Sequence, residues 1–180
     1  MAKKSNSTIK KIQSVNPATL EVNCEIEPTP AEDVKAIVAG AREAQVKWAA
    51  AGLSERLRYI RKVKHYLTKH MDEICRIITL DNGKTLVESL NTEVMPVLDM
   101  VNFCLKDAPA ALRDEHLHNP MFKLLRIRSR NIFEPLGVVA VIAPWNFPFT
   151  IPTTQILMAL TAGNTVVLKP AAMTAYVGDL

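Results

Sequence analysis

Apolar side chains recur at helical spacing through the first two thirds of the chain. Four of them keep a period near 3.6 residues: Val34, Val38, Ala41 and Trp48. The helix that they predict is expected to begin at Thr29-Pro30-Ala31-Glu32 and to end near Gly52. A capping Thr, a Pro at the first helical position and a Glu three residues after the cap together satisfy the free amides of a helix start.

Two further helices and a hairpin are predicted around this one. The second helix begins with Ser54 as its cap and ends about Asp81-Asn82-Gly83. The third runs from about Thr85, and Pro96 is expected to kink or split it because proline removes a backbone donor. Before all three, residues 12–26 hold the turn-like Asn16-Pro17-Ala18-Thr19 between short apolar stretches, which predicts a small hairpin.

Strand patterns replace the helical spacing in the last third of the chain. Between Leu124 and Arg130 basic residues stand at every second position from 126, as on a half-exposed strand. Residues 137–143 and 165–168 are apolar or β-branched and do not alternate with polar residues, a pattern typical of strands covered on both faces in a parallel sheet. With the helical stretch 151–162 between them, they predict an α/β fold: amino-terminal helices followed by the start of a doubly wound parallel sheet.

Composition narrows the class of protein. The 180 residues are 48% hydrophobic, enough for one domain with a sizeable core. The net charge of +4 comes partly from lysines in residues 1–11, a flexible basic tail, and no basic stripe with interleaved aromatics predicts a nucleic-acid partner. The apolar segment 138–168 contains Pro144, Pro148 and Pro152, which argue against a membrane span.

The cysteines and histidines predict neither disulfides nor a metal site. Three widely spaced cysteines, Cys24, Cys75 and Cys104, fit no disulfide framework, and no signal-peptide run follows the basic start. A reduced, cytoplasmic protein is therefore expected. Within residues 114–118, His116 and His118 alternate as metal ligands could, but no third ligand group is evident and a polar surface turn is favoured.

The best candidate site is Pro144-Trp145-Asn146-Phe147-Pro148, directly after the first buried strand, where open α/β sheets place their ligands. Asn146 offers an amide donor in a rigid setting, and such a donor can stabilise a developing oxyanion. An ordinary turn asparagine fits the spacing equally well. Lys169, directly after the second strand, is on its own a solvated charge.

Two motifs in the last third resemble the aldehyde dehydrogenase superfamily: Pro-Trp-Asn-Phe-Pro at 144–148 and Gly-Asn-Thr-Val-Val-Leu-Lys-Pro at 163–170. Residues 16–19, 81–84 and 134–139 resemble the family's opening hairpin, a helix end and the approach to its first cofactor-domain strand. The resemblance covers about Ile12 to Pro170. It implies a helical part of the cofactor-binding domain at 12–120, an oligomerisation-type strand at 121–137 and a Rossmann-like strand-helix-strand at 138–180.

The resemblance also implies a chemistry. In the family a cysteine thiolate attacks an aldehyde, an asparagine amide helps to hold the oxyanion, and hydride passes to NAD or NADP before water releases the acid. Asn146 matches that asparagine and Lys169 the lysine that binds the adenosine ribose, while Ile142, Pro144 and Trp145 would line the dinucleotide. Ala172 stands where the family often has an acidic residue, so a shift toward NADP is expected because no carboxylate repels the 2′-phosphate.

The family's glycine-containing cofactor turn, general-base glutamate and nucleophilic cysteine would all follow Leu180, where the sequence ends. Nothing near the three cysteines supplies the base or the positive charge that a nucleophilic thiolate needs. The expectation is a truncated, NAD(P)-dependent aldehyde dehydrogenase without turnover of its own. Three alternatives stay open: an interaction module that pairs with another aldehyde dehydrogenase chain or a homo-oligomer, a split-enzyme half, and a nucleotide-binding module based on Lys169.

Overall fold

The computed structural model describes residues 11–117 and 120–180, so most of the expected basic tail lies outside the described residues. The chain opens with the predicted hairpin, in which β1 (Ile12–Val15) pairs antiparallel with β2 (Val22–Ile26). The side chain of Asn16 accepts a hydrogen bond from the Ala18 amide at 2.9 Å, which stabilises the turn between the strands. The hairpin prediction is confirmed.

Three long helices follow, and two of their predicted boundaries are wrong. Helix α1 (Val34–Ala50) starts after Thr29, because the Asp33 amide donates to the Pro30 carbonyl and forms a turn there. The long second helix divides at His70 into α2 (Gly52–Lys69) and α3 (Met71–Asn82). Helix α3 ends where predicted, at Gly83, whose left-handed φ of 82° favours glycine.

The third helical region is divided, as Pro96 predicts. Thr85 and Glu88 form a capping box at α4 (Leu86–Glu88), and a π-helical turn η1 (Ser89–Val94) leads into α5 (Met95–Lys106). Pro96 stands in the first turn of α5, directly after η1, where the backbone changes from π-helical to α-helical hydrogen bonding. A short α6 (Ala108–Ala111) closes this region.

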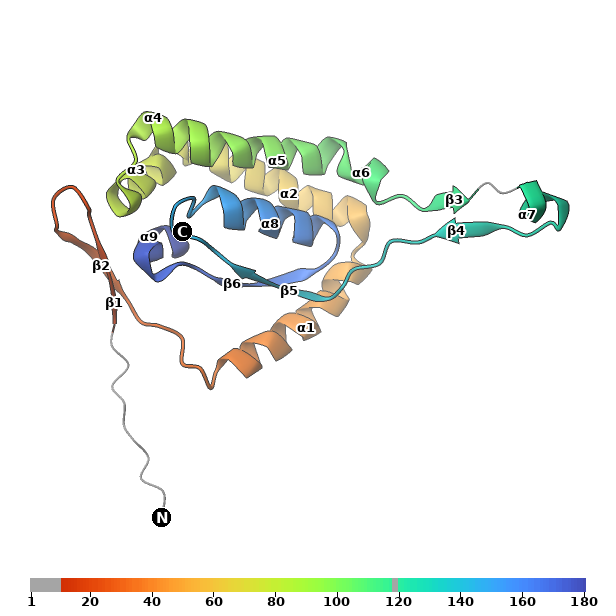
Figure 1. The fold of residues 1–180 in the computed structure, drawn as a ribbon, viewed down its shortest axis with the longest axis horizontal. Coiled ribbons are helices and arrows are strands. Elements are labelled where there is room, and N and C mark those ends of the chain that lie inside the picture. The colour runs from red at the N-terminus through yellow and green to blue at the C-terminus, as the bar shows by residue number, and fades with distance from the viewer. Residues whose placement is uncertain (1–10, 118–119) are drawn as a thin grey trace, which may run out of the picture.

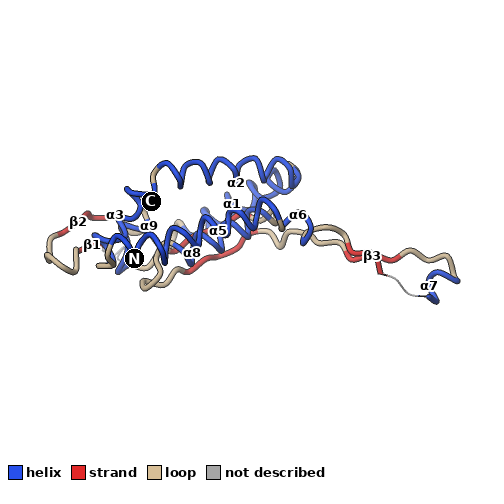
Figure 2. The backbone as a smooth tube through the Cα atoms, turned by 90° about the horizontal axis from the view of Figure 1, so that it is seen from above, coloured by secondary structure: helices blue, strands red, loops and turns tan. Residues whose placement is uncertain are grey.

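Residues 115–117 and 120–131 form an arm that projects from the body (Figures 1 and 2). Strand β3 (Glu115–Leu117) pairs antiparallel with β4 (Ser129–Asn131), and α7 (Pro120–Leu124) lies at the tip. The predicted strand at 121–137 is thus mostly wrong, since a helix and a positive φ at Arg126 replace its first half. The predicted polar turn at 114–118 is instead a strand over Glu115–Leu117, and His118 lies outside the described residues.

The strand-helix-strand unit is confirmed. Strand β5 (Val138–Ile142) pairs parallel with β6 (Thr165–Lys169), and α8 (Thr150–Thr161) connects them. Helix α1 packs against one side of the two strands and α8 against the other, as Figure 1 shows. Val141 is buried, but Ala140 and Ile142 are exposed, so the prediction of a strand covered on both faces is wrong at this end of β5.

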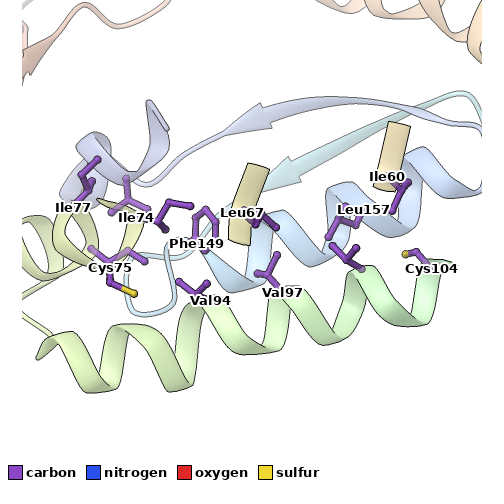
Figure 3. Packing of buried hydrophobic residues seen from close by; sticks show 13 residues of the cluster. Ile60, Leu67, Ile74, Cys75, Ile77, Val94, Val97, Cys104, Phe149 and Leu157 are labelled. Carbon is purple, nitrogen blue, oxygen red and sulfur yellow. The ribbon is translucent and has the colours of Figure 1, made fainter. Parts of the chain in front are cut away.

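A second helical layer covers α8 and forms the core. Helices α2 and α5 pack against each other and against α8, and their buried apolar side chains meet those of α3 (Figure 3). A short 3-10 turn η2 (Ala172–Thr174) and α9 (Ala175–Gly178) follow β6 and place Val177 in the same core. Among the described residues, no helix is long and apolar enough to cross a membrane.

Candidate active site

The predicted site residues come together at the carboxyl edge of the two parallel strands. Ile142, the last residue of β5, stands in register with Lys169, the last residue of β6. The Ala143 amide donates to the Lys169 carbonyl at 3.0 Å, which continues the ladder by one residue. The loop of Pro144, Trp145 and Asn146 therefore begins directly beside Lys169.

This loop presents its central residues to solvent. Ile142 is 73% exposed and Trp145 55%, and Asn146 is exposed as well. Pro148 and Phe149 are buried at the far end of the loop, where α8 begins. Pro148 and Phe149 thus anchor one end of the loop in the apolar core, whereas the amide side chain of Asn146 is exposed. An exposed amide of this kind can donate a hydrogen bond to a bound substrate.

Two polar side chains from the end of α3 hold the loop. Asn82 Nδ2 donates to the Trp145 carbonyl at 2.9 Å, and Lys84 Nζ donates to the Asn146 carbonyl at 2.8 Å. The Lys84 ammonium also lies 4.2 Å from the centre of the Phe147 ring, within the range of a cation–π contact. Neither residue was predicted as part of the site from the sequence.

Glu93 completes this arrangement from η1. Its side chain is fully buried, forms an ion pair with Lys84 and accepts hydrogen bonds from the amides of Phe149 at 3.2 Å and Thr150 at 2.7 Å. These amides open α8, where the helix dipole favours a negative charge. The carboxylate therefore caps α8 from another part of the chain and fixes Lys84 at the same time.

Lys169 and Ala172 line a cavity of about 620 Å³, to which the Asn146 loop does not contribute. Ile26, Pro28, Thr29 and Ala171 contribute to its wall. The lining is mostly apolar, with the Lys169 ammonium, the Thr29 hydroxyl and the carboxylates of Glu27 and Asp179 as its charged and hydroxyl groups. A cavity of this size and lining can hold the base and the ribose hydroxyls of an adenosine. Ile142, Pro144 and Trp145 do not line it, so the predicted cofactor residues do not share one cavity with Lys169.

The surroundings of the three cysteines differ from those of nucleophilic thiols. Burial raises the pKa of the Cys75 and Cys104 thiols, and both lie in the helical core. Burial and the carboxylates of Asp81 and Asp179 raise the pKa of Cys24. A raised pKa keeps a thiol protonated near neutral pH and lowers its reactivity. Among the residues that the structure describes, no three His, Cys, Asp or Glu side chains form a metal site.

A parallel strand-helix-strand unit with a polar loop at its carboxyl edge is typical of nucleotide-dependent α/β enzymes. The sequence profile of the aldehyde dehydrogenase family matches residues 3–180. The chain belongs to the aldehyde dehydrogenase family.

Individual relatives agree with this assignment. Malonate-semialdehyde dehydrogenase of Bacillus velezensis is 35% identical over 160 residues, which are 89% of this chain and 32% of that protein. The chain thus spans about a quarter to a third of the length of the curated relatives it matches.

Solved structures share the fold. An NADP dependent enzyme of E. coli superposes with a TM-score of 0.85 at 28% identity, over 94% of this chain and 34% of that one. A putative methylmalonate-semialdehyde dehydrogenase of Sinorhizobium meliloti, complexed with NAD, gives 0.83 at 28% identity, over 98% and 34% of the two chains. The α/β arrangement of the described residues is therefore that of aldehyde dehydrogenases.

Proposed function

We propose that these residues supply the oxyanion donor and part of the dinucleotide site of an NAD(P)-dependent aldehyde dehydrogenase, which oxidises an aldehyde to a carboxylic acid. The observation that carries the proposal is the loop holding Asn146, which leaves the carboxyl edge of β5 directly beside Lys169 on β6. Open α/β sheets bind their ligands at this edge. The relatives described as NADP dependent or complexed with NAD support the choice of cofactor.

Each site residue has a separate proposed task. The Asn146 amide donates a hydrogen bond to the oxygen of the substrate carbonyl, which gains negative charge when a nucleophile adds to the carbon. Lys169 donates to a ribose hydroxyl of the adenosine, and Ile142, Pro144 and Trp145 give the dinucleotide an apolar surface. The bound dinucleotide supplies the hydride acceptor.

The same proposal has a consequence for the nucleophile. Cys75 and Cys104 are buried in the core, and Cys24 lies in β2 of the opening hairpin, where burial and two carboxylates raise the pKa of its thiol. We therefore expect these 180 residues to have no turnover alone. Further sequence, in the same chain or another, would supply the thiolate and the general base.

The direct test is aldehyde-dependent formation of NADH or NADPH by the purified 180-residue chain, its mass confirmed, with short, long and acidic aldehydes. We expect no turnover above the blank. Turnover that Asn146→Ala abolishes would contradict the expected inactivity, because one of the three cysteines would then act. Turnover that survives both Asn146→Ala and replacement of all three cysteines would come from a contaminating enzyme.

A second candidate function, pairing with another aldehyde dehydrogenase chain, is supported by the arm. Its side chains Leu124, Leu125 and Ile127 are 78%, 59% and 50% exposed. Exposed apolar side chains that lie together often mark a protein interface. Light scattering and co-purification with a full-length aldehyde dehydrogenase test the pairing. Leu125→Asp should abolish it, whereas Val46→Asp, at a 65% exposed position on α1, should not.

A further inference from the structure

The peptide groups on both sides of Asn146 are anchored by side chains. The Trp145 carbonyl, which accepts from Asn82, belongs to the peptide plane before Asn146, and the Asn146 carbonyl, which accepts from Lys84, belongs to the plane after it. Because peptide groups are planar, holding both oxygens restricts the two backbone dihedrals of Asn146. The direction in which its side chain leaves the backbone is thereby restricted as well.

The anchoring cation is itself held in place. The Lys84 ammonium has the Glu93 carboxylate, the Asn146 carbonyl and the Phe147 ring as partners, and its side chain is only 17% exposed. Hydrogen bonds that involve charged groups are shorter and stronger than neutral ones. Glu93 in turn binds the first amides of α8, so the loop is fixed from its middle to its end.

The backbone at the end of α3 lets two nearby side chains reach one loop. Gly83 separates Asn82 from Lys84 and reverses the chain with its φ of 82°. A Cβ at this position would lie 2.8 Å from Pro17 Cγ, closer than carbon atoms approach. Gly83 thus combines a left-handed backbone with a close approach to the opening hairpin, and it aims Asn82 and Lys84 at neighbouring carbonyls.

We propose that Asn82 and Lys84 are positioning residues, which set the direction of the Asn146 amide by holding the peptide planes on either side of it. Glu93 acts through Lys84. This inference rests on the proposed role of Asn146 as the oxyanion donor. It predicts that removing the side chain of Asn82 or of Lys84 makes the loop around Asn146 more mobile while the surrounding core stays folded.

Trp145 reports on the loop directly. The chain has two tryptophans, so Trp48→Phe leaves Trp145 as the only one. In that background Asn82→Asp and Lys84→Met should raise the acrylamide quenching constant of Trp145 about two-fold and lower its fluorescence anisotropy, because a loop with fewer anchors opens more often. Circular dichroism confirms that each variant is folded.

Two matched variants control for a general loss of stability. Asn23 Nδ2 donates to the Leu80 carbonyl at 3.0 Å, near the same end of α3 but away from the loop, and Lys64 Nζ donates to Asn102 Oδ1 at 2.8 Å. Asn23→Asp and Lys64→Met should leave both Trp145 signals unchanged. If Lys84→Met does not fold, Asn82→Asp decides the question alone. Trp145 signals equal to those of the controls in Asn82→Asp would overturn the proposal.

Activity gives a second, separate readout. In an active assembly that contains these residues, Asn82→Asp should lower kcat roughly 10-fold to 100-fold, because small displacements of a catalytic group cost about that much. The KM for the dinucleotide should change much less than kcat, because the cavity beside Lys169 is lined by residues outside this loop. If no assembly is active, the proposed function fails, whereas the Trp145 signals still decide whether Asn82 and Lys84 hold the loop.

Discussion

The two segments that follow the parallel strands are fixed to the rest of the molecule in different ways. After β5, side chains from α3 bind the carbonyls of Trp145 and Asn146, and Glu93 binds the start of α8. After β6, the hydrogen bond of Lys169 Nζ within the described residues goes to the neighbouring Pro170 carbonyl, at 3.3 Å. The next hydrogen bond to a distant side chain joins the Val177 amide to Asp81, at 2.9 Å.

This difference matches the two proposed tasks. A donor that stabilises charge on a reacting oxygen must be held in place before the reaction begins, because reorganising it would add to the barrier. A lysine that binds a ribose hydroxyl carries its charge on a flexible stem and adapts to its ligand. We therefore expect variants near Asn146 to change stability or kcat, and variants near Lys169 to change cofactor binding.

The largest expected effect is the loss of stability when the buried carboxylate of Glu93 is removed. Glu93→Ala leaves the Lys84 ammonium largely buried without its partner and uncaps α8, so the free energy of unfolding should fall by about 3–5 kcal/mol. Urea denaturation measures the change. As a control, Glu73→Ala removes an exposed carboxylate that pairs with His70 and should cost less than about 0.5 kcal/mol. Similar losses in the two variants would show that the loop does not depend on Glu93.

Asn146→Ala should separate stability from catalysis. Its side chain is exposed, so the free energy of unfolding should change by less than about 0.5 kcal/mol. In an active assembly the loss of one oxyanion donor should lower kcat roughly 10²–10³-fold. Asn91→Ala, at an exposed position of η1, should alter neither quantity. An unchanged kcat in Asn146→Ala would show that Asn146 is an ordinary turn residue and not the oxyanion donor.

Local signals account for what the sequence predicted correctly. The two strands contain runs of β-branched residues, and Gly163 and Asn164 stop the helix between them, so residues 138–169 were predicted within a few positions. The break at His70 was missed because the apolar period continues across it without Gly or Pro. After Thr29 a turn formed in place of the predicted helix cap. The spacing of residues along the sequence does not decide between these two patterns of local hydrogen bonds.

The candidate site was predicted only in part, for a physical reason. Asn146 and Lys169 directly follow strands, and the ends of parallel strands meet at one edge. Asn82, Lys84 and Glu93 precede the loop by more than fifty residues, so no spacing rule links them to it. Glu93 also lies in a helical region that gave no sign of a buried carboxylate. Its burial depends on the tertiary contact between η1 and α8.

Lys169→Met should affect ligand binding alone. The loss of a charged donor should raise the dissociation constant for the dinucleotide roughly 10-fold to 150-fold, since hydrogen bonds to charged groups contribute about 1.5–3 kcal/mol. Titration calorimetry with NAD and NADP measures it, and the unfolding free energy should stay the same. Lys106→Met, an exposed lysine at the end of α5, is the matched control. A loss of stability in Lys169→Met would contradict the contrast between the two segments.

The smallest expected effect concerns the choice between the two cofactors. Ala172 is exposed at the start of η2 and lines the cavity beside Lys169. Ala172→Glu places a carboxylate there, which repels a 2′-phosphate and can accept from a 2′-hydroxyl. The ratio of dissociation constants should therefore move a few-fold toward NAD, as expected for charges in a solvated setting.

Met173→Glu, at the neighbouring position that is 69% exposed, adds the same charge outside the cavity lining and should leave the ratio unchanged. A clear NAD preference with Ala172 in place would refute the expected shift toward NADP. An equal response in both glutamate variants would mean that long-range charge, rather than a contact at residue 172, sets the preference. Lys169 would then remain the contact to the ribose, and specificity would come from residues outside this segment.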